Sequence, residues 1–284
     1  MTFDELINEW TASRVAVGDV MEYTAKKDAY WARMLEGLLS RECDEIRKID
    51  VIKEIGAMRK TRSSNSVRSA IKRGKSAFKW GRLMDLTTNA PFDNVPMPKV
   101  DPTKRNALSP EDAKRLRAEL DADESDISLM AKVALMTGMR YGEVLALRGS
   151  DIDGCTITVN RSVKCDLKIG EPKTRSSKRR IAIPQSLADE LKARGEGPLF
   201  TMSYNRGEHQ WAMWRESHGF HGLKFHELRH THATLLIGDG VDVKTVQHRL
   251  GHSSATITMD VYAHAIPSLD VEAADKIERM VSNG

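Results

Sequence analysis

Apolar residues recur at intervals of three and four along the first eighty residues, which is the spacing of amphipathic helices. Ile46, Ile49, Ile52 and Ile55 illustrate the pattern. It predicts a small helical domain with helices over residues 3–10, 20–39, 44–58 and 66–83. At residues 89–102, four prolines without apolar periodicity indicate an extended linker between domains.

A second domain begins at Ser109, a helix-capping residue that Pro110 and two acidic residues follow. β-branched residues between turn signals predict strands at 155–159 and 179–183. Helical patterns cover residues up to about 120 and then 127–137, 186–194, 206–217, 226–237, 243–250 and 257–263. We therefore predict a mainly α protein with a small antiparallel β-sheet. Its parts are a helical domain at 1–88, a linker at 89–106, a second domain at 107–266 and a tail helix at 267–284.

The composition is that of a soluble protein, and its length of 284 residues favours two domains. Hydrophobic residues make up 40% and charged residues 30%, and the mean hydropathy is −0.45. No apolar run has the length of a membrane span, and the first residues lack the layout of a signal peptide. Cys43, Cys155 and Cys165 fit neither a disulfide framework nor a zinc module. We expect a cytoplasmic protein that does not enter a membrane.

Positive charge is concentrated in one stretch, although the net charge is only +4. Residues 59–82 contain no acidic residue and nine basic ones: Arg59, Lys60, Arg62, Arg68, Lys72, Arg73, Lys75, Lys79 and Arg82. A basic run of this kind can be a solvated helix face. The interleaved serines, Phe78 and Trp80 favour a helix that faces a polyanion.

His226, Glu227 and His230 form the H-E-x-x-H pattern of zinc proteases. A catalytic zinc needs a third protein ligand. In the extended form of the motif, a glycine and a third histidine would stand where this chain has Ala233 and Leu236. Zinc hydrolysis therefore stays only as a weak alternative.

Arg229 offers a second interpretation of the same stretch. His226 and Arg229 are three residues apart on a predicted helix, so both can contact one anion. Arg140, which follows a glycine-containing helix end, supplies a second guanidinium that Glu143 could orient, although such a pair alone is usually a surface salt bridge. Two arginines can neutralise a phosphoryl group in a transition state.

Three further residues could complete a phosphoryl-transfer site. Lys173 lies in a basic, hairpin-like stretch, 171–184, and could protonate a leaving oxygen. His252 follows a glycine that ends a helix, and Tyr262 comes ten residues later. Each has an ordinary structural interpretation as a turn, capping or core residue. A phenol is a nucleophile only when a base and positive charges assist it.

Together these residues resemble, in order and approximate spacing, the catalytic set of the tyrosine recombinases, the phage integrase family. The resemblance covers residues 107–270, and the helical segment before the linker looks like that family's core-site-binding domain. Five stretches carry it: TGMRYGEVLALRGSDI, PKTRSSKRRIAIP, FHELRHTHAT, VQHRLGHSS and DVYAH.

The resemblance implies a SAM-like helical core-binding domain, an α+β catalytic domain and a role for each matched residue. Tyr262 would attack the scissile phosphodiester and form a 3′-phosphotyrosyl link. Arg140, Arg229 and His252 would hold the non-bridging oxygens. Lys173 would be the general acid, His226 a base or an orienting group, and Glu143 a support for Arg140. The basic run, with Arg175 and Lys178, would bind DNA.

Other expectations come from the same resemblance, which implies that the reaction needs no metal and no other cofactor. Integration or excision of a phage or mobile element is the expected task, in a bacterial cytoplasm and on the nucleoid. Double-stranded DNA core sites and a homotetramer on DNA are the implied partners, with accessory DNA-bending or directionality proteins as further ones. The apolar positions of the tail helix would contact a neighbouring subunit. A type IB topoisomerase and a DNA-binding module without activity stay as alternatives.

Overall fold

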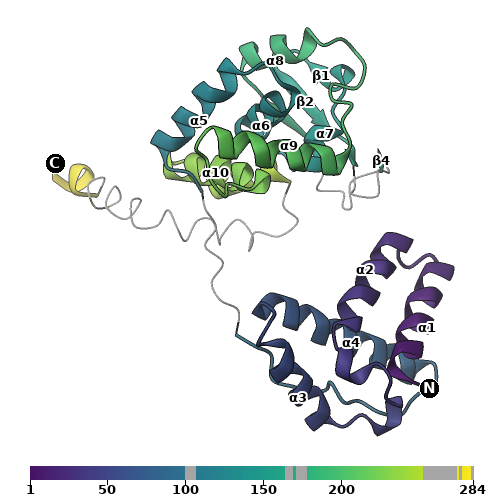
Figure 1. The fold of residues 1–284 in the computed structure, drawn as a ribbon. Coiled ribbons are helices and arrows are strands. Elements are labelled where there is room, and N and C mark those ends of the chain that lie inside the picture. The colour runs from purple at the N-terminus through teal and green to yellow at the C-terminus, as the bar shows by residue number, and fades with distance from the viewer. Residues whose placement is uncertain (100–106, 164–168, 171–177, 252–273, 275–276, 283–284) are drawn as a thin grey trace. The chain divides into compact units, whose positions relative to one another are not determined.

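The computed structural model describes residues 1–99, 107–163, 169–170, 178–251, 274 and 277–282, and the chain divides into two compact units, Met1–Lys104 and Arg105–Gly284 (Figure 1). The predicted helix at 257–263 lies outside the described residues. No helix among those ranges is both long and apolar enough to cross a membrane. Within the predicted tail, residues 277–282 are helical, and Ile277, Met280 and Val281 are exposed.

The described residues of the first unit form four α-helices, α1 (Phe3–Ala16), α2 (Glu22–Arg33), α3 (Lys48–Met58) and α4 (Ser64–Leu83), and two 3-10 turns at Glu36–Leu38 and Cys43–Glu45. The N-terminus of α1 is fixed by a capping box. The Glu5 backbone N–H donates to the Thr2 hydroxyl, and the Thr2 N–H donates to the Glu5 carboxylate. Phe3, Phe78 and Phe92 form the centre of the core, with ring centroids 5.3–6.0 Å apart. This aromatic cluster joins α1, α4 and the segment that follows α4.

The sequence prediction was wrong in detail for α2 and α3. The predicted helix at 20–39 ends at Arg33, and a separate 3-10 turn follows at Glu36–Leu38. Ile49 and Ile52 are 46% and 41% exposed, whereas Ile46 and Ile55 are buried, so only half of the isoleucine repeat lies on the buried side. Val51, Ile55 and Met58 are the buried residues, at the i, i+4 and i+7 positions of a helix that begins only at Lys48.

Part of the predicted linker packs against the first unit. Phe92 is 2% exposed and Val95 is 9% exposed, and both belong to the core cluster of α1–α4. The prolines around them do prevent helix formation. They do not prevent burial, because the Phe92 ring fills the space beside Gly74 of α4.

The second unit is mainly helical with a small antiparallel sheet, as the sequence predicted. Three strands pair in the order β1 (Ile152–Asp153), β2 (Thr156–Val159) and β5 (Arg179–Ala182), and β3 (Ser162–Val163) pairs with β4 (Ile169–Gly170). The helices are α5 (Pro110–Ala122), α6 (Asp126–Thr137), α7 (Tyr141–Leu145), α8 (Gln185–Lys192), α9 (Tyr204–Ser217), α10 (Phe225–Gly238) and α11 (Val243–Leu250). Helix α6 is buried along almost its whole length and packs against α5 and α10.

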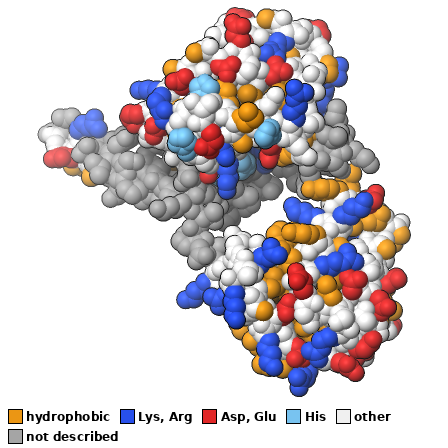
Figure 2. Space-filling model, in the orientation of Figure 1, with side chains coloured by type: hydrophobic (Ala, Val, Ile, Leu, Met, Phe, Trp, Pro, Cys, Tyr) orange, Lys and Arg blue, Asp and Glu red, His pale blue; other side chains and the backbone are white. Residues whose placement is uncertain are grey.

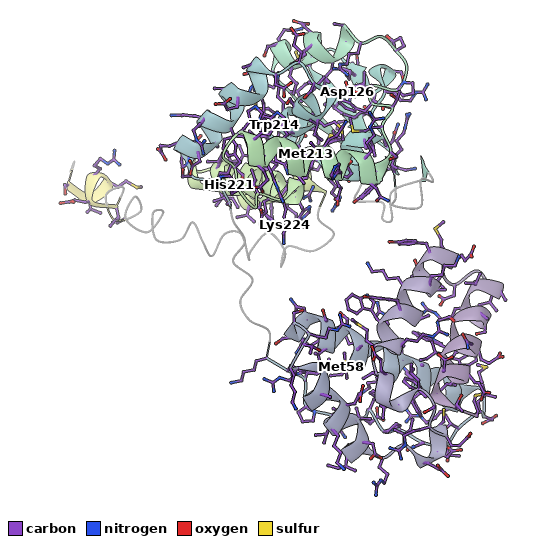
Figure 3. The ribbon with its side chains drawn as sticks, in the orientation of Figure 1. Met58, Asp126, Met213, Trp214, His221 and Lys224 are labelled. Atoms are coloured by element: carbon purple, nitrogen blue, oxygen red, sulfur yellow. The ribbon has the colours of Figure 1, made fainter. Side chains whose placement is uncertain are left out.

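Aromatic rings join α7, α9 and α10. The Tyr141 ring lies between Tyr204 and Phe225, with centroids at 4.7 and 4.9 Å, and its hydroxyl donates to the Tyr204 carbonyl. On α9, Figure 3 labels Trp214, which is buried, beside Met213, which is exposed. Because Arg140 precedes Tyr141 and His226 follows Phe225, this contact brings the first turns of α7 and α10 together.

The contact between Gly74 and Phe92 predicts opposite effects for two Gly→Ala substitutions in helices. A Cβ at Gly74 would lie 2.7 Å from the Phe92 ring, so Gly74→Ala should destabilise the first unit by about 1–3 kcal/mol. Gly56 of α3 has nothing within 4 Å of its Cβ position, so Gly56→Ala should stabilise the unit by about 0.5–1 kcal/mol.

Hydrogen exchange of α4 peptides in the full-length chain measures both effects without assuming that the two units unfold together. Equal stabilisation by the two alanines would contradict the packing of Phe92 on α4.

Candidate active site

The turn between α6 and α7 places Arg140. Gly138 ends α6 with φ of 68°, a left-handed conformation, and a Cβ there would lie 2.5 Å from Leu250. Arg140 then precedes α7, and the Glu143 carboxylate accepts both its backbone N–H at 2.9 Å and its Nη1 at 2.7 Å. Glu143 therefore fixes the Arg140 main chain and side chain, as the sequence predicted for this pair.

Arg229 reaches the same turn from α10. Its Nη1 donates to the Gly138 carbonyl at 2.6 Å. Its side chain is buried, and its Nη2 has no hydrogen-bond acceptor among the described residues. Burial and then the positive charge of Arg140 lower the pKa of Arg229 to about 9, with Glu143 acting in the opposite direction and Arg179 adding to the decrease. Arg229 is thus charged at neutral pH, and no acidic side chain among the described residues forms an ion pair with it.

Arg140 is the more accessible of the two guanidinium groups. Its side chain is 37% exposed, and its Nη2 donates to the Gly251 carbonyl at 3.2 Å, at the C-terminus of α11. Two arginines from different helices thus meet near the α6–α7 turn, one buried and one open to solvent. A pair of guanidinium groups of this kind is suited to an anion with several oxygens, such as a phosphodiester.

The remaining residues of the zinc pattern have other contacts. His226 is exposed, and its ring meets the edge of the His230 ring at 4.9 Å. The Glu227 carboxylate accepts the backbone N–H of Lys224 at 2.7 Å and so caps its own helix (Figure 3 labels Lys224). Within the described parts of the chain, no three His, Cys, Asp or Glu side chains are grouped to hold a metal ion.

Several predicted site residues cannot be placed. Lys173, Arg175, His252 and Tyr262 lie outside the described residues. Lys178 is described and exposed, immediately before β5.

Arg179 lies beside these residues, and the sequence reasoning did not select it. It is buried and forms a bidentate ion pair with Glu143, at 3.2 and 2.9 Å. Alternation contained the signal, because Arg179 and Ile181 alternate along β5, Ile183 follows the strand at the same spacing, and all three are buried.

The basic run divides into paired and unpaired residues. Arg73 donates to Asp28, Lys75 and Arg82 contact Asp93, and Arg68 donates to the Pro98 carbonyl. Figure 2 shows Lys and Arg side chains distributed over the visible face of the first unit, which contains this run. Five cations are exposed without an ion pair to any described residue: Arg59, Lys60, Arg62, Lys72 and Lys79.

Comparisons with known proteins agree with this geometry. A model of the phage integrase family matches residues 106–268. The ICEBs1 integrase of Bacillus subtilis is 26% identical over 92% of this chain and 75% of its own length. The integrase of Staphylococcus phage L54a is 25% identical over 99% of this chain and 94% of its own length.

Solved structures show the same fold. The integrase of transposon Tn1549, in complex with transposon right end DNA, matches with a TM-score of 0.80 at 23% identity, over 97% of this chain and 99% of that chain. A λ integrase dimer bound to a core site matches with a TM-score of 0.73 at 19% identity, over 92% and 95%. Since the family model covers more than half of the sequence, the chain belongs to the phage integrase family of tyrosine recombinases.

The buried His232 of α10 predicts that the stability of the second unit depends on pH. Its Nδ1–H donates to the Leu135 carbonyl at 2.8 Å, and its Nε2 accepts from Arg249 at 3.5 Å. Burial and then the Arg249 charge lower the pKa of His232 to about 4 from 6.5. As the pH falls, the unfolded chain takes up this proton first, so stability is full above pH 6.5 and is lost between 6.5 and 4, by up to about 3 kcal/mol.

His232→Asn keeps a donor for the Leu135 carbonyl and removes the titration. The variant should therefore lose less stability than the wild type over this pH range, and the two curves should be parallel above pH 6.5. Urea titrations at stepped pH, with hydrogen exchange measured on α10 peptides, follow this unit alone. Parallel curves down to pH 4 would show that His232 does not carry the effect.

Proposed function

We propose that this protein is a site-specific integrase that cuts and rejoins double-stranded DNA at core sites through a 3′-phosphotyrosyl intermediate. The observation that carries the proposal is the buried Nη2 of Arg229, which has no acceptor among the described residues and lies beside Arg140. A buried, charged guanidinium whose N–H lacks an acceptor destabilises the fold unless an anion binds to it during function.

Arg229 and Arg140 would act on the non-bridging oxygens of the scissile phosphate. Charge increases on these oxygens as the phosphorus becomes five-coordinate, and donors already in place stabilise that charge without reorganisation. Arg229 is held by Gly138 and Arg140 by Glu143 and Gly251, so neither guanidinium has to be ordered by the substrate.

The remaining roles rest on the sequence motifs. The Tyr262 oxygen attacks phosphorus and forms the phosphotyrosyl bond, the bond from phosphorus to the 5′ oxygen breaks, and Lys173 gives that oxygen a proton. His226 accepts the tyrosine proton or orients the phenol, and His252 adds a hydrogen bond to the phosphate. In the second step, a 5′ hydroxyl of the partner strand attacks the phosphotyrosine and releases Tyr262.

A homotetramer on DNA is the assembly that we propose for strand exchange. A λ integrase tetramer bound to a Holliday junction supports it, since it has a TM-score of 0.72 with this chain at 18% identity, over 90% of this chain and 79% of that chain. Integration or excision of a phage or mobile element is the proposed task, with accessory DNA-bending or directionality proteins selecting the direction.

Covalent capture tests the chemistry. The wild type and the Tyr262→Phe variant are incubated in EDTA with fragmented DNA of the source cell and its mobile elements, and protein-linked DNA is recovered and sequenced. The wild type should be linked to a discrete sequence, whereas the phenylalanine variant should bind with similar affinity and form no link, because binding is dominated by charge. A covalent link formed by Tyr262→Phe would show that Tyr262 is not the nucleophile. Linkage of the wild type to scattered sequences would favour a topoisomerase.

Arg229→Lys completes this test at the pair of guanidinium groups. The lysine keeps a positive charge but cannot donate to the Gly138 carbonyl and also present a second N–H in the same plane. The rate of linkage should fall by roughly 10²- to 10³-fold, with DNA affinity almost unchanged. An unaffected rate would separate Arg229 from the reaction.

The unpaired cations of α4 and the residues before it predict a salt effect on binding. Replacing Arg62, Lys72 and Lys79 by glutamine should make the slope of log K against log salt shallower by about 0.9 for each lost phosphate contact. Arg73→Gln is the matched control, because Arg73 donates to the buried Asp28 and should affect stability more than the slope. Fluorescence anisotropy at several salt concentrations measures the slopes, and an unchanged triple variant would assign these residues to a solvated surface.

A further inference from the structure

Arg179 is a buried cation with an unusual set of partners. Its side chain is 1% exposed and projects from β5, opposite Val159 of β2. Two of its nitrogens donate to the two oxygens of Glu143, at 3.2 and 2.9 Å, and its Nε donates to the Arg249 carbonyl at 2.6 Å. A guanidinium so fully desolvated has to be held by several hydrogen bonds, and these fix its orientation.

Glu143 transmits this orientation to Arg140. The same carboxylate accepts the Arg140 N–H and Nη1. Burial raises its pKa, but the hydrogen bond and charge of Arg179, followed by those of Arg140, outweigh this and hold the pKa below its usual value. The carboxylate is therefore ionised and lies between two guanidinium groups, one fully buried and one partly open to solvent.

The two arginines also contact the same turn of α11. Arg179 donates to the Arg249 carbonyl, and Arg140 donates to the Gly251 carbonyl two residues later. Arg140, Glu143, Arg179 and the carbonyls of Arg249 and Gly251 thus form a closed ring of contacts, the arginine ring, which links α7, β5 and the C-terminus of α11. Glu143 accepts from both arginines.

We infer that Arg179 is a positioning residue for Arg140, which it holds through Glu143 and the α11 turn without contacting the DNA. The inference rests on the proposed function, in which Arg140 contacts the scissile phosphate. Without Arg179, the carboxylate loses its bidentate contact and can rotate, so Arg140 can follow it away from the phosphate. A displacement of about 1 Å in such a site can reduce a rate by about 10²-fold.

Single-turnover cleavage of a duplex carrying the captured sequence tests this inference. Arg179→Met should form the covalent link about 10²-fold more slowly than the wild type, with unchanged DNA affinity. Arg179→Lys keeps the buried charge and should recover part of the rate, and it also serves if the methionine variant does not fold. When Arg140→Lys is already present, Arg179→Met should slow cleavage by less than about twofold, since it acts through Arg140.

Lys132→Met is the matched control for a buried cation. Lys132 is 7% exposed and pairs with Asp121 and Glu190, away from the arginine ring. Its loss should reduce the stability of the unit and leave the cleavage rate of the folded protein unchanged. Equal slowing by Lys132→Met and Arg179→Met would reduce Arg179 to a general contribution to stability.

A substrate with sulfur in place of the 5′ bridging oxygen separates Arg140 from Lys173. A thiolate leaves without a general acid, so this substrate would rescue a variant in which Lys173 is misplaced. Arg179→Met should stay slow on it. Rescue by sulfur, wild-type rates for both Arg179 variants, or equal slowing with and without Arg140→Lys would each overturn the inference.

A second measurement does not depend on cleavage. In ¹⁵N spectra, the side-chain signals of Arg140 should show restricted rotation in the wild type and in Lys132→Met and faster rotation in Arg179→Met. If the wild type forms no covalent link, the proposed function fails, and these spectra still determine whether Arg179 holds Arg140. Unchanged Arg140 signals in Arg179→Met would overturn the inference.

Discussion

The arrangement of the candidate site in the second unit depends on the ion pairs of the buried Glu143 carboxylate with Arg140 and Arg179. Its charge is removed from water, and only correctly placed donors offset that cost. Those donors come from the N-terminus of α7 and from β5, and both arginines are also tied to the end of α11. The strand register, the α6–α7 turn and the α11 turn must therefore all form for one side chain to be satisfied.

Beside this balanced ring lies a charge that is not balanced. Among the described residues, Arg229 has one acceptor, the Gly138 carbonyl, and the positive charges of Arg140 and Arg179 repel it. The same chain thus compensates one buried charge fully and leaves its neighbour under-compensated. Such a contrast is typical of a site that completes its electrostatics only with a ligand. The repulsion between Arg229 and Arg140 also explains why the two side chains need a rigid support, since they would otherwise move apart.

The sequence predicted the second unit better than the first. Helices α5, α6, α10 and α11 have clear apolar periodicity and strong end signals, and their observed bounds are within two residues of the predicted ones. At α3 the isoleucine repeat was only half right, since Ile49 and Ile52 are exposed. Burial depends on tertiary contacts that periodicity alone does not contain. For the candidate site, motif spacing predicted Arg140, Glu143 and Arg229, and the structure brings these three side chains to one turn. Arg179 was missed because its partners are distant in sequence, and a basic stretch at a strand start looks like surface.

The packing of Phe92 affects where the chain can be divided. The fall in helical periodicity after Leu83 suggests that the first unit could be cut near residue 88. A fragment ending there would lack one of the three rings of its aromatic cluster and would expose the apolar surface beside Gly74. Such a fragment would tend to self-associate, and its failure to bind DNA would then reflect a damaged core and not a missing contact.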